Sequence, residues 1–203
     1  VRNANDMILQ YAYGQDGFDG AKIEKTYFDY LDMTHSNFQR LYQFMPDDNL
    51  AAMLTPETYA ELTADPNWKD ILDQEFTRIS EDRNLLKYTI FKDEIPENIY
   101  SPVNFKRMIK NYQYRFNLTD VPVASVNPVY VITKVDELIR EFIDSNKPAL
   151  EGVNFAILIA TVRSHMASKK IINEKYSKAA FDFLLQEIRT KYYEALVPPG
   201  EMV

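Results

Sequence analysis

Apolar side chains recur along the chain at intervals of three, four and seven residues, the spacing that puts them on one face of an α-helix. One such pattern follows Asp65 and another follows Ser101. Two more cover residues 131–142 and 177–196. We therefore expect an amphipathic helix in each stretch. Residues 153–172 differ, because their first half is apolar on nearly all sides, which predicts one central buried helix.

Three helix starts are predicted by a side-chain oxygen followed by proline. These pairs are Thr55-Pro56, Asp65-Pro66 and Ser101-Pro102. The oxygen can cap the first turn of a helix. Proline has no backbone N–H, but at the first helical position an N–H would have no partner within the helix, so proline is tolerated there. Residues 121–129 carry two prolines and should form an extended connection, while the proline pair at 198–199 should end the last helix.

Strand signals are few. Residues 7–13 form a short apolar run that favours a strand or a helical turn, and Tyr88–Phe91 is a second candidate strand. The loop that follows the first run contains Gly14, Gly17 and Gly20, which suits backbone with positive φ. The sequence thus predicts a mainly α fold (α+β with minor strand content): a multi-helix domain with a short N-terminal strand/loop segment.

Composition narrows the functional classes. The 203 residues include no cysteine, which excludes disulfides, thiolate zinc sites and thiol nucleophiles. Only 5 glycines argue against a fold built on glycine-rich phosphate loops, whereas 14 tyrosines and 12 phenylalanines must fill cores or contact surfaces. The longest apolar run is far shorter than the roughly 20 residues of a membrane span, so we expect no membrane segment.

The acidic loop at Asp16–Gly20 invites a metal interpretation. From Asp16, however, Phe18 and Gly20 fill two of the alternate positions where a calcium loop needs oxygen ligands, and Tyr27 stands at the twelfth, where it needs Glu. The third aspartate of a polymerase magnesium motif is absent as well. We favour a turn whose aspartates cap backbone N–H groups. His35 and His165 are far apart in sequence, and we expect His165 on the polar side of its helix.

Basic residues gather on the predicted helix after Ser101. Lys106, Arg107 and Lys110 are interleaved with aromatic residues, so they could contact a phosphate backbone or stack a base. A second basic group comprises Arg163 and Lys169–Lys170. The alternative, which we favour, is a solvated or salt-bridging helix face. The aromatic residues between positions 27 and 44 are expected in a core, with a protein contact as the second interpretation.

Several stretches resemble, in the same order, one family: the largest subunit of eukaryotic-type multisubunit DNA-directed RNA polymerases, in its domain 6, the foot segment of the shelf module. The strongest match is the loop signature, with Tyr13, Gly14, Asp16, Gly17 and Asp19, although Gln15 stands where the family usually has Glu. Further matching runs are Arg2–Asn3, Pro102–Ile109, Arg163–Lys170, Lys178–Leu185 and Val197–Val203.

The resemblance implies a fragment of a larger chain in three parts. Residues 1–25 would be a junction that packs on the polymerase core, residues 26–197 the helical foot domain, and residues 198–203 the start of the path toward the trigger loop. The segment would be a structural and interaction module that supports DNA-templated RNA synthesis without catalytic residues. It would be inactive alone and hold no cofactor, since the magnesium and zinc of this nucleotidyltransferase lie elsewhere in the subunit.

The implied partners are the small subunits of the shelf module, transcription or RNA-processing factors on the exposed face, and DNA or RNA through the whole DNA-binding enzyme. The parent polymerase would act in the nucleus if cellular, and in the host cytoplasm or the virion if it belongs to a large DNA virus. We favour a viral or divergent version, because the stretches between the motifs have drifted. A stand-alone helical protein-interaction adaptor is the alternative, and a metal enzyme using Asp16 and Asp19 is the third hypothesis.

Overall fold

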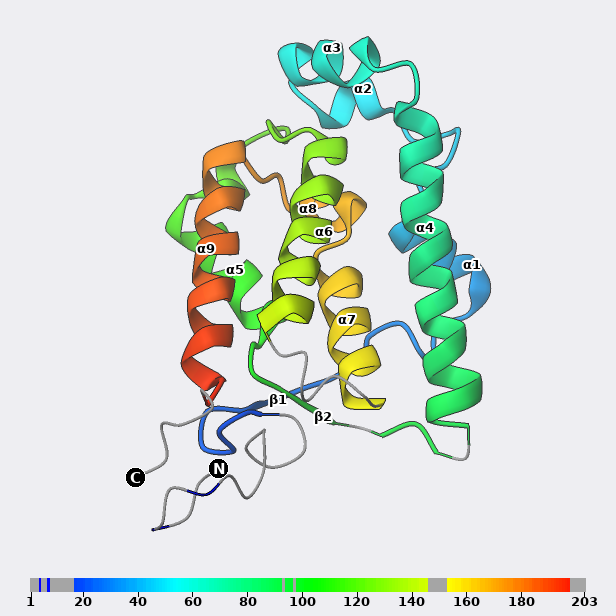
Figure 1. The fold of residues 1–203 in the computed structure, drawn as a ribbon. Helices are drawn as coiled ribbons and strands as arrows, with labels where there is room; N and C mark the ends of the chain where they lie inside the picture. Colours follow the sequence, from blue (N-terminus) through cyan, green and yellow to red (C-terminus); the bar gives the residue numbers. More distant parts are fainter. Residues whose placement is uncertain are drawn as a thin grey trace.

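Helices make up most of the computed structural model, which describes residues 4, 7, 17–92, 94–96, 98–145 and 153–197 (Figure 1). A two-stranded antiparallel sheet pairs Lys25 with Tyr100. The prediction of a mainly α fold with minor strand content is confirmed. In chain order the elements are β1 (Glu24–Thr26), α1 (His35–Tyr42), α2 (Leu50–Met53), α3 (Pro56–Ala64), α4 (Trp68–Leu85), the π-helix η1 (Leu86–Ile90), β2 (Ile99–Ser101), α5 (Phe105–Arg115), the 3-10 helix η2 (Leu118–Asp120), α6 (Pro128–Ser145), α7 (Val153–His165), α8 (Ser168–Asn173) and α9 (Lys178–Ala195).

The helix α7 lies between two hydrophobic clusters. Leu158 and Val162 pack into the larger cluster, with side chains of α5, α6 and α9. Ala160, on another side of the same helix, packs into a smaller cluster with side chains of α1 and α4. Residues 153–165 thus form the buried central helix expected from the sequence. Within the described ranges, no helix combines the length and apolarity needed to cross a membrane.

Only one of the three predicted helix starts is placed correctly. Thr55 caps α3, with its hydroxyl accepting from the Thr58 N–H, and Pro56 is the first helical residue. Asp65 and Ser101 instead cap turns: their side chains accept from the N–H groups two residues later. The helices then begin at Trp68 and Phe105. The oxygen-proline pair therefore marked a turn in two cases, because an Asx or Ser turn uses the same hydrogen bond as a helix cap.

The single helix predicted over residues 153–172 is wrong, because it breaks after His165. Ala167 has extended backbone, with φ −55° and ψ 136°, and α8 begins at Ser168. The Ser168 N–H, which would otherwise bond within a continuous helix, donates to the Glu75 carboxylate of α4 at 2.8 Å, and the Ser168 hydroxyl donates to the other oxygen of the same group. A carboxylate from a distant part of the chain thus supplies the cap of α8.

His165 does not lie on a polar helix side, as we expected, but is 5% exposed. Its ring stacks on Phe105 with the centroids 5.9 Å apart, and Nδ1 lies 2.9 Å from the Thr161 carbonyl oxygen. Burial, with a smaller contribution from the charge of Lys170, lowers the pKa of His165 to about 4. The imidazole is therefore neutral at physiological pH and packs as a side chain of the hydrophobic core.

The candidate strand at Tyr88–Phe91 is also wrong, since Tyr88–Ile90 continue α4 as part of the π-helix η1 and Phe91 is its C-cap. The Phe91 N–H donates to the Leu86 carbonyl at 2.8 Å, and Leu86 is fully buried. The other candidate strand, at residues 7–13, and the proline pair at 198–199 lie outside the described residues, apart from Met7. The extended connection predicted over residues 121–129 is only partly right, because residues 122, 123 and 126 are bends and α6 already begins at Pro128, while Ala124 and Ser125 form single bridges.

The buried guanidinium of Arg83 fastens the loop before α1 to α4. Its Nε donates to the Tyr30 carbonyl at 2.8 Å, a second nitrogen donates to Met33, and the group lies 4.7 Å from the centroid of the Phe38 ring. The bonds of Arg83 to the Tyr30 and Leu31 carbonyls are buried and the bond to Met33 is partly buried, so water has little access to replace them. One planar cation with several donors satisfies these carbonyls together, which a lysine cannot do.

Replacing Arg83 should therefore destabilise the chain strongly. Arg83→Met leaves buried carbonyls without donors, and we expect a loss of about 3 kcal/mol in the free energy of unfolding. Arg78→Met is the matched control on the same helix, because that side chain is 44% exposed and pairs with Asp136 at the surface. The control should lose less than about 1 kcal/mol. Urea unfolding followed by circular dichroism measures both, and equal losses would contradict the role given to Arg83.

The Glu75 cap predicts an unusual pH dependence. Burial raises the pKa of Glu75 to about 7, despite the lowering effect of the two Ser168 hydrogen bonds. A carboxyl group that binds its proton more tightly when folded stabilises the fold below its unfolded pKa, near 4.5, and loses this contribution as pH rises through about 7. His165 acts oppositely, because its lowered pKa favours the fold above about 6.5. Between about pH 4.5 and pH 6.5, the free energy of unfolding therefore falls with rising pH through Glu75 and rises through His165.

A difference measurement isolates Glu75. As pH rises from 5 to 8, the wild type loses the Glu75 contribution and Glu75→Gln does not. The free energy of unfolding of the variant should therefore rise by roughly 2 kcal/mol relative to that of the wild type, which corresponds to about 4–8 °C in the unfolding midpoint. Thermal unfolding of both proteins over this range tests it, and the unchanged His165 contribution cancels. A midpoint difference that stays constant with pH would show that the Glu75 carboxyl titrates normally.

Candidate functional site

The described part of the signature loop packs against the end of α9. The Asp19 N–H donates to the Ala195 carbonyl at 2.8 Å, and the Val197 N–H donates to the Gly17 carbonyl at 2.9 Å. Between them, the Phe18 ring meets Tyr192 edge to face, with the centroids 5.4 Å apart. These contacts join two segments that lie far apart in sequence.

The turn chemistry expected for this loop is present in its described part, at Asp19. Gly17 has a φ of 77°, in the region that favours glycine, and the Asp19 carboxylate accepts from the Ala21 N–H at 3.0 Å. The other signature residues, Tyr13, Gly14 and Asp16, lie outside the described residues. Among the side chains that the structure describes, no group of three or more histidine, aspartate or glutamate residues is placed to hold a metal ion.

The predicted basic residues diverge on α5. Arg107 pairs with Glu24 of β1 at 2.5 Å. Lys106 donates to the Tyr27 hydroxyl and lies 3.5 Å from the Asp29 carboxylate. The Tyr27 hydrogen bond raises the pKa of Lys106. Two of the three cations thus tie α5 to the strand and loop before α1.

Lys110 is exposed and lines a small cavity of about 210 Å³ together with Lys106. The same cavity is lined by Lys170, whose amine lies 4.7 Å from the centroid of the Tyr42 ring. Burial lowers the pKa of Lys170 to about 8. Asp29 and Glu174 also line this cavity, so its lining mixes both signs of charge.

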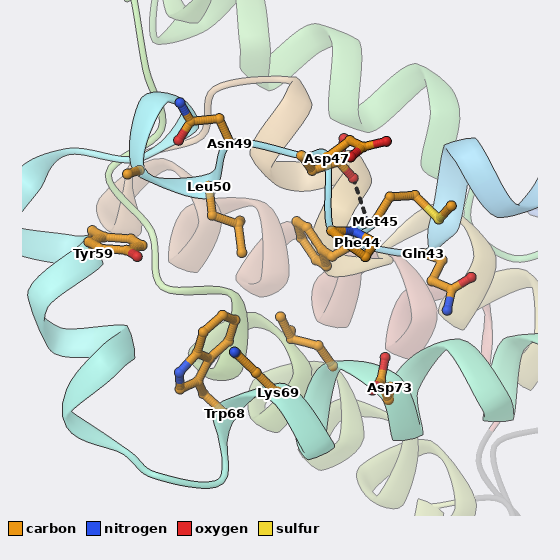
Figure 2. A pocket seen from close by; sticks show the side chains of 14 residues that line it. Gln43, Phe44, Met45, Asp47, Asn49, Leu50, Tyr59, Trp68, Lys69 and Asp73 are labelled. Atoms are coloured by element: carbon orange, nitrogen blue, oxygen red, sulfur yellow. Dashed lines mark hydrogen bonds between the residues drawn. The ribbon is translucent and has the colours of Figure 1, made fainter.

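A larger cavity of about 750 Å³ lies between the segment of residues 43–51 and the start of α4 (Figure 2). Its aromatic lining consists of Phe44, Tyr59 and Trp68. Figure 2 shows Leu50 and Trp68 reaching from opposite walls toward the centre, while Asp47 and Asp73 lie near the edge. The cavity volume falls in the range of about 300–1,000 Å³ that is typical of ligand pockets. We call this feature the α2–α4 cavity.

Lys169 anchors one wall of the α2–α4 cavity. Its buried amine donates to the Gln43 carbonyl at 2.6 Å and to the Asp48 carboxylate at 2.5 Å. Asp48 also accepts from the Met45 N–H at 2.7 Å, the bond that is dashed in Figure 2. Burial alone would raise the pKa of Asp48, but the hydrogen bonds from Lys169 and Met45 outweigh it and lower that pKa. The wall is therefore held in place by the chain itself.

The sequence analysis missed this cavity, although the distribution of charge could have indicated it. Residues 41–77 contain eight Asp or Glu and one Lys, a net charge of −7 that equals the formal charge of the whole chain. The remaining residues contain 22 acidic and 22 basic side chains. All of the excess negative charge thus belongs to the segment that lines the α2–α4 cavity.

Comparison with known proteins agrees with the resemblance read from the motifs. The chain matches the family described as RNA polymerase Rpb1, domain 6, over residues 18–195. It is 28% identical to the DNA-directed RNA polymerase II subunits RPB1-A and RPB1-B of Trypanosoma brucei brucei, in alignments of 228 residues that cover 100% of this chain. The chain spans only 13% of the length of each of these two relatives. Since the family match covers most of the chain, this protein belongs to the family of domain 6 of the RNA polymerase subunit Rpb1.

Proposed function

We propose that this chain is a structural and interaction module of the largest subunit of a DNA-directed RNA polymerase, and that it supports RNA synthesis without supplying catalytic residues. The observation that carries the proposal is the extent of the similarity, which covers 100% of this chain but 13% of the relatives. A segment of that share is one part of a large subunit. The polymerase chemistry, with its magnesium and zinc, would belong to other parts of the enzyme.

The ion pairs of α5 support a structural role for this segment. Arg107 and Lys106 connect a helix to β1 and to the loop after it. The hydrogen bonds between residues 17–19 and the end of α9 do the same for the N-terminal junction. We propose that residues 1–25 continue this junction onto the polymerase core, and that the shelf-module subunits and transcription or RNA-processing factors contact the helical part.

Affinity capture tests the proposal. The native protein that carries this sequence, tagged and purified from its source, should bring down the other polymerase subunits in stoichiometric amounts. Peptide mapping should find sequence before Val1 and after Val203. A free chain of this size without polymerase subunits would refute the proposal and favour the adaptor. The same tagged protein also tests the compartment. We expect it in the nucleus if it belongs to a cellular polymerase, and in the host cytoplasm or the virion if it belongs to a viral one.

We propose that Lys106, Arg107 and Lys110 form a salt-bridging or solvated helix face, and nucleic-acid contact is the alternative that a separate experiment tests. Because two of these cations have partners within the chain, we expect charge reversal of Lys110 alone to leave DNA and RNA retention by the purified polymerase within about twofold of wild type. Lys175→Glu, a lysine change outside this group, is the control. A clear loss of retention and a shallower salt dependence for Lys110→Glu would instead establish a phosphate contact.

A further inference from the structure

We propose that the α2–α4 cavity is a docking site for a basic peptide segment of a partner protein, one that inserts a large apolar side chain between flanking lysines or arginines. The inference deepens the proposed function, on which it rests, by assigning one place on the module to partner contact and by defining the chemistry of the partner.

The first argument is charge complementarity. Of the acidic residues in the segment 41–77, five are exposed, namely Asp47, Glu57, Glu61, Asp70 and Asp73. Lys69 is the single basic residue of this segment. In the lining itself Asp48 is paired with Lys169 and Lys69 adds one positive charge, so Asp47 and Asp73 leave a net negative charge there, to which the other exposed carboxylates of the segment add at longer range. Such a potential attracts cationic segments and repels nucleic acid. The acidic charge of this segment would likewise repel the same segment of a second copy.

The second argument comes from the aromatic lining. Large apolar and aromatic side chains that are half-buried around a cavity offer the kind of pocket that an anchoring side chain fills at an interface. Phe44, Leu50 and Trp68 are half-buried here. The rings also accept cations: Lys69 Nζ lies 5.4 Å from the Trp68 centroid and Lys169 Nζ 5.7 Å from that of Phe44. Because these lysines of the chain already lie over the two rings, the apolar side chain of a partner is the group that would fill the cavity, and its basic residues would meet Asp47 and Asp73 at the edge.

The third argument is that the walls are already fixed. Lys169 and Asp48 hold the segment of residues 43–48 to α8, and the opposite wall is the regular helix α4. A preformed pocket binds with little ordering cost, so a short peptide can bind without folding of the site. These observations together favour a linear basic segment over a rigid domain, because only a narrow segment can enter a cavity of about 750 Å³.

The test uses the assembled polymerase that contains the full chain. The probe is a fluorescent peptide of about twelve residues that alternates lysine or arginine with leucine or tryptophan, and binding is followed by fluorescence anisotropy at low ionic strength. A second peptide replaces leucine and tryptophan with serine, and a third replaces the basic residues with glutamate. We expect binding of the first peptide only, with an affinity that falls as salt is added.

Three variants place the site on this chain. Asp47→Lys/Asp73→Lys reverses the rim, and Ala51→Trp fills the cavity from an exposed lining position. Each of these two changes should weaken binding of the first peptide at least about tenfold. The control, Asp32→Lys/Asp120→Lys, makes the same change in charge at exposed positions outside the segment 41–77 and should stay within about twofold of wild type.

The outcomes separate the two proposals. Normal assembly of all variants with unchanged peptide binding overturns the docking site and leaves the polymerase role intact. Equal binding of the serine peptide, or failure of the wild type to bind, also overturns it. Recovery of this chain without polymerase subunits refutes the polymerase role, and the same peptides then test the cavity on the free chain. Self-association that Ala51→Trp abolishes would assign the cavity to a second copy and reject a basic partner.

Discussion

The fold depends on burying α7 on more than one side. Because Leu158 and Val162 need the cluster of α5, α6 and α9 while Ala160 needs the cluster of α1 and α4, neither cluster covers this helix alone. Figure 1 shows α6 beside α4 and α9, and α7 contacts α4, α5 and α6. Loss of either cluster would expose apolar surface of α7, and the two should therefore unfold together.

This arrangement also explains why polar groups are buried. Where α7 ends, the chain turns within the interior, and the backbone groups of that turn cannot reach water. The Glu75 carboxylate caps α8, and the Thr161 carbonyl oxygen bonds to Nδ1 of the His165 ring. The Arg83 guanidinium donates to the carbonyls of the loop before α1. Glu75 and Arg83 both lie on α4, whereas His165 and Thr161 both lie on α7, so α4 supplies two of these three solutions. The buried polar groups thereby specify how α4, α7 and α8 meet, in addition to what they add to stability.

Sequence reasoning succeeded where the determining contact is local. Thr55 caps its own next turn, and the apolar periods of residues 68–85 and 178–195 are properties of those stretches alone. It failed where a distant group decides. The break after His165 depends on a carboxylate 93 residues away from Ser168, and nothing near His165 reveals the Phe105 ring that covers it. The α2–α4 cavity is of the same kind, since its walls meet only after folding, although the acidic excess of residues 41–77 is visible in the sequence.

The position of that acidic excess bears on how such a module can work within a large enzyme. In Figure 1, α2 and α3 lie at the opposite end of the molecule from β1 and β2. If residues 1–25 attach the segment to the rest of its subunit, as we propose, the end with the α2–α4 cavity points away from the attachment. The rest of the chain contains equal numbers of acidic and basic residues. An incoming basic segment would therefore be steered to one end by long-range attraction, while its affinity would come from the apolar anchor in the cavity.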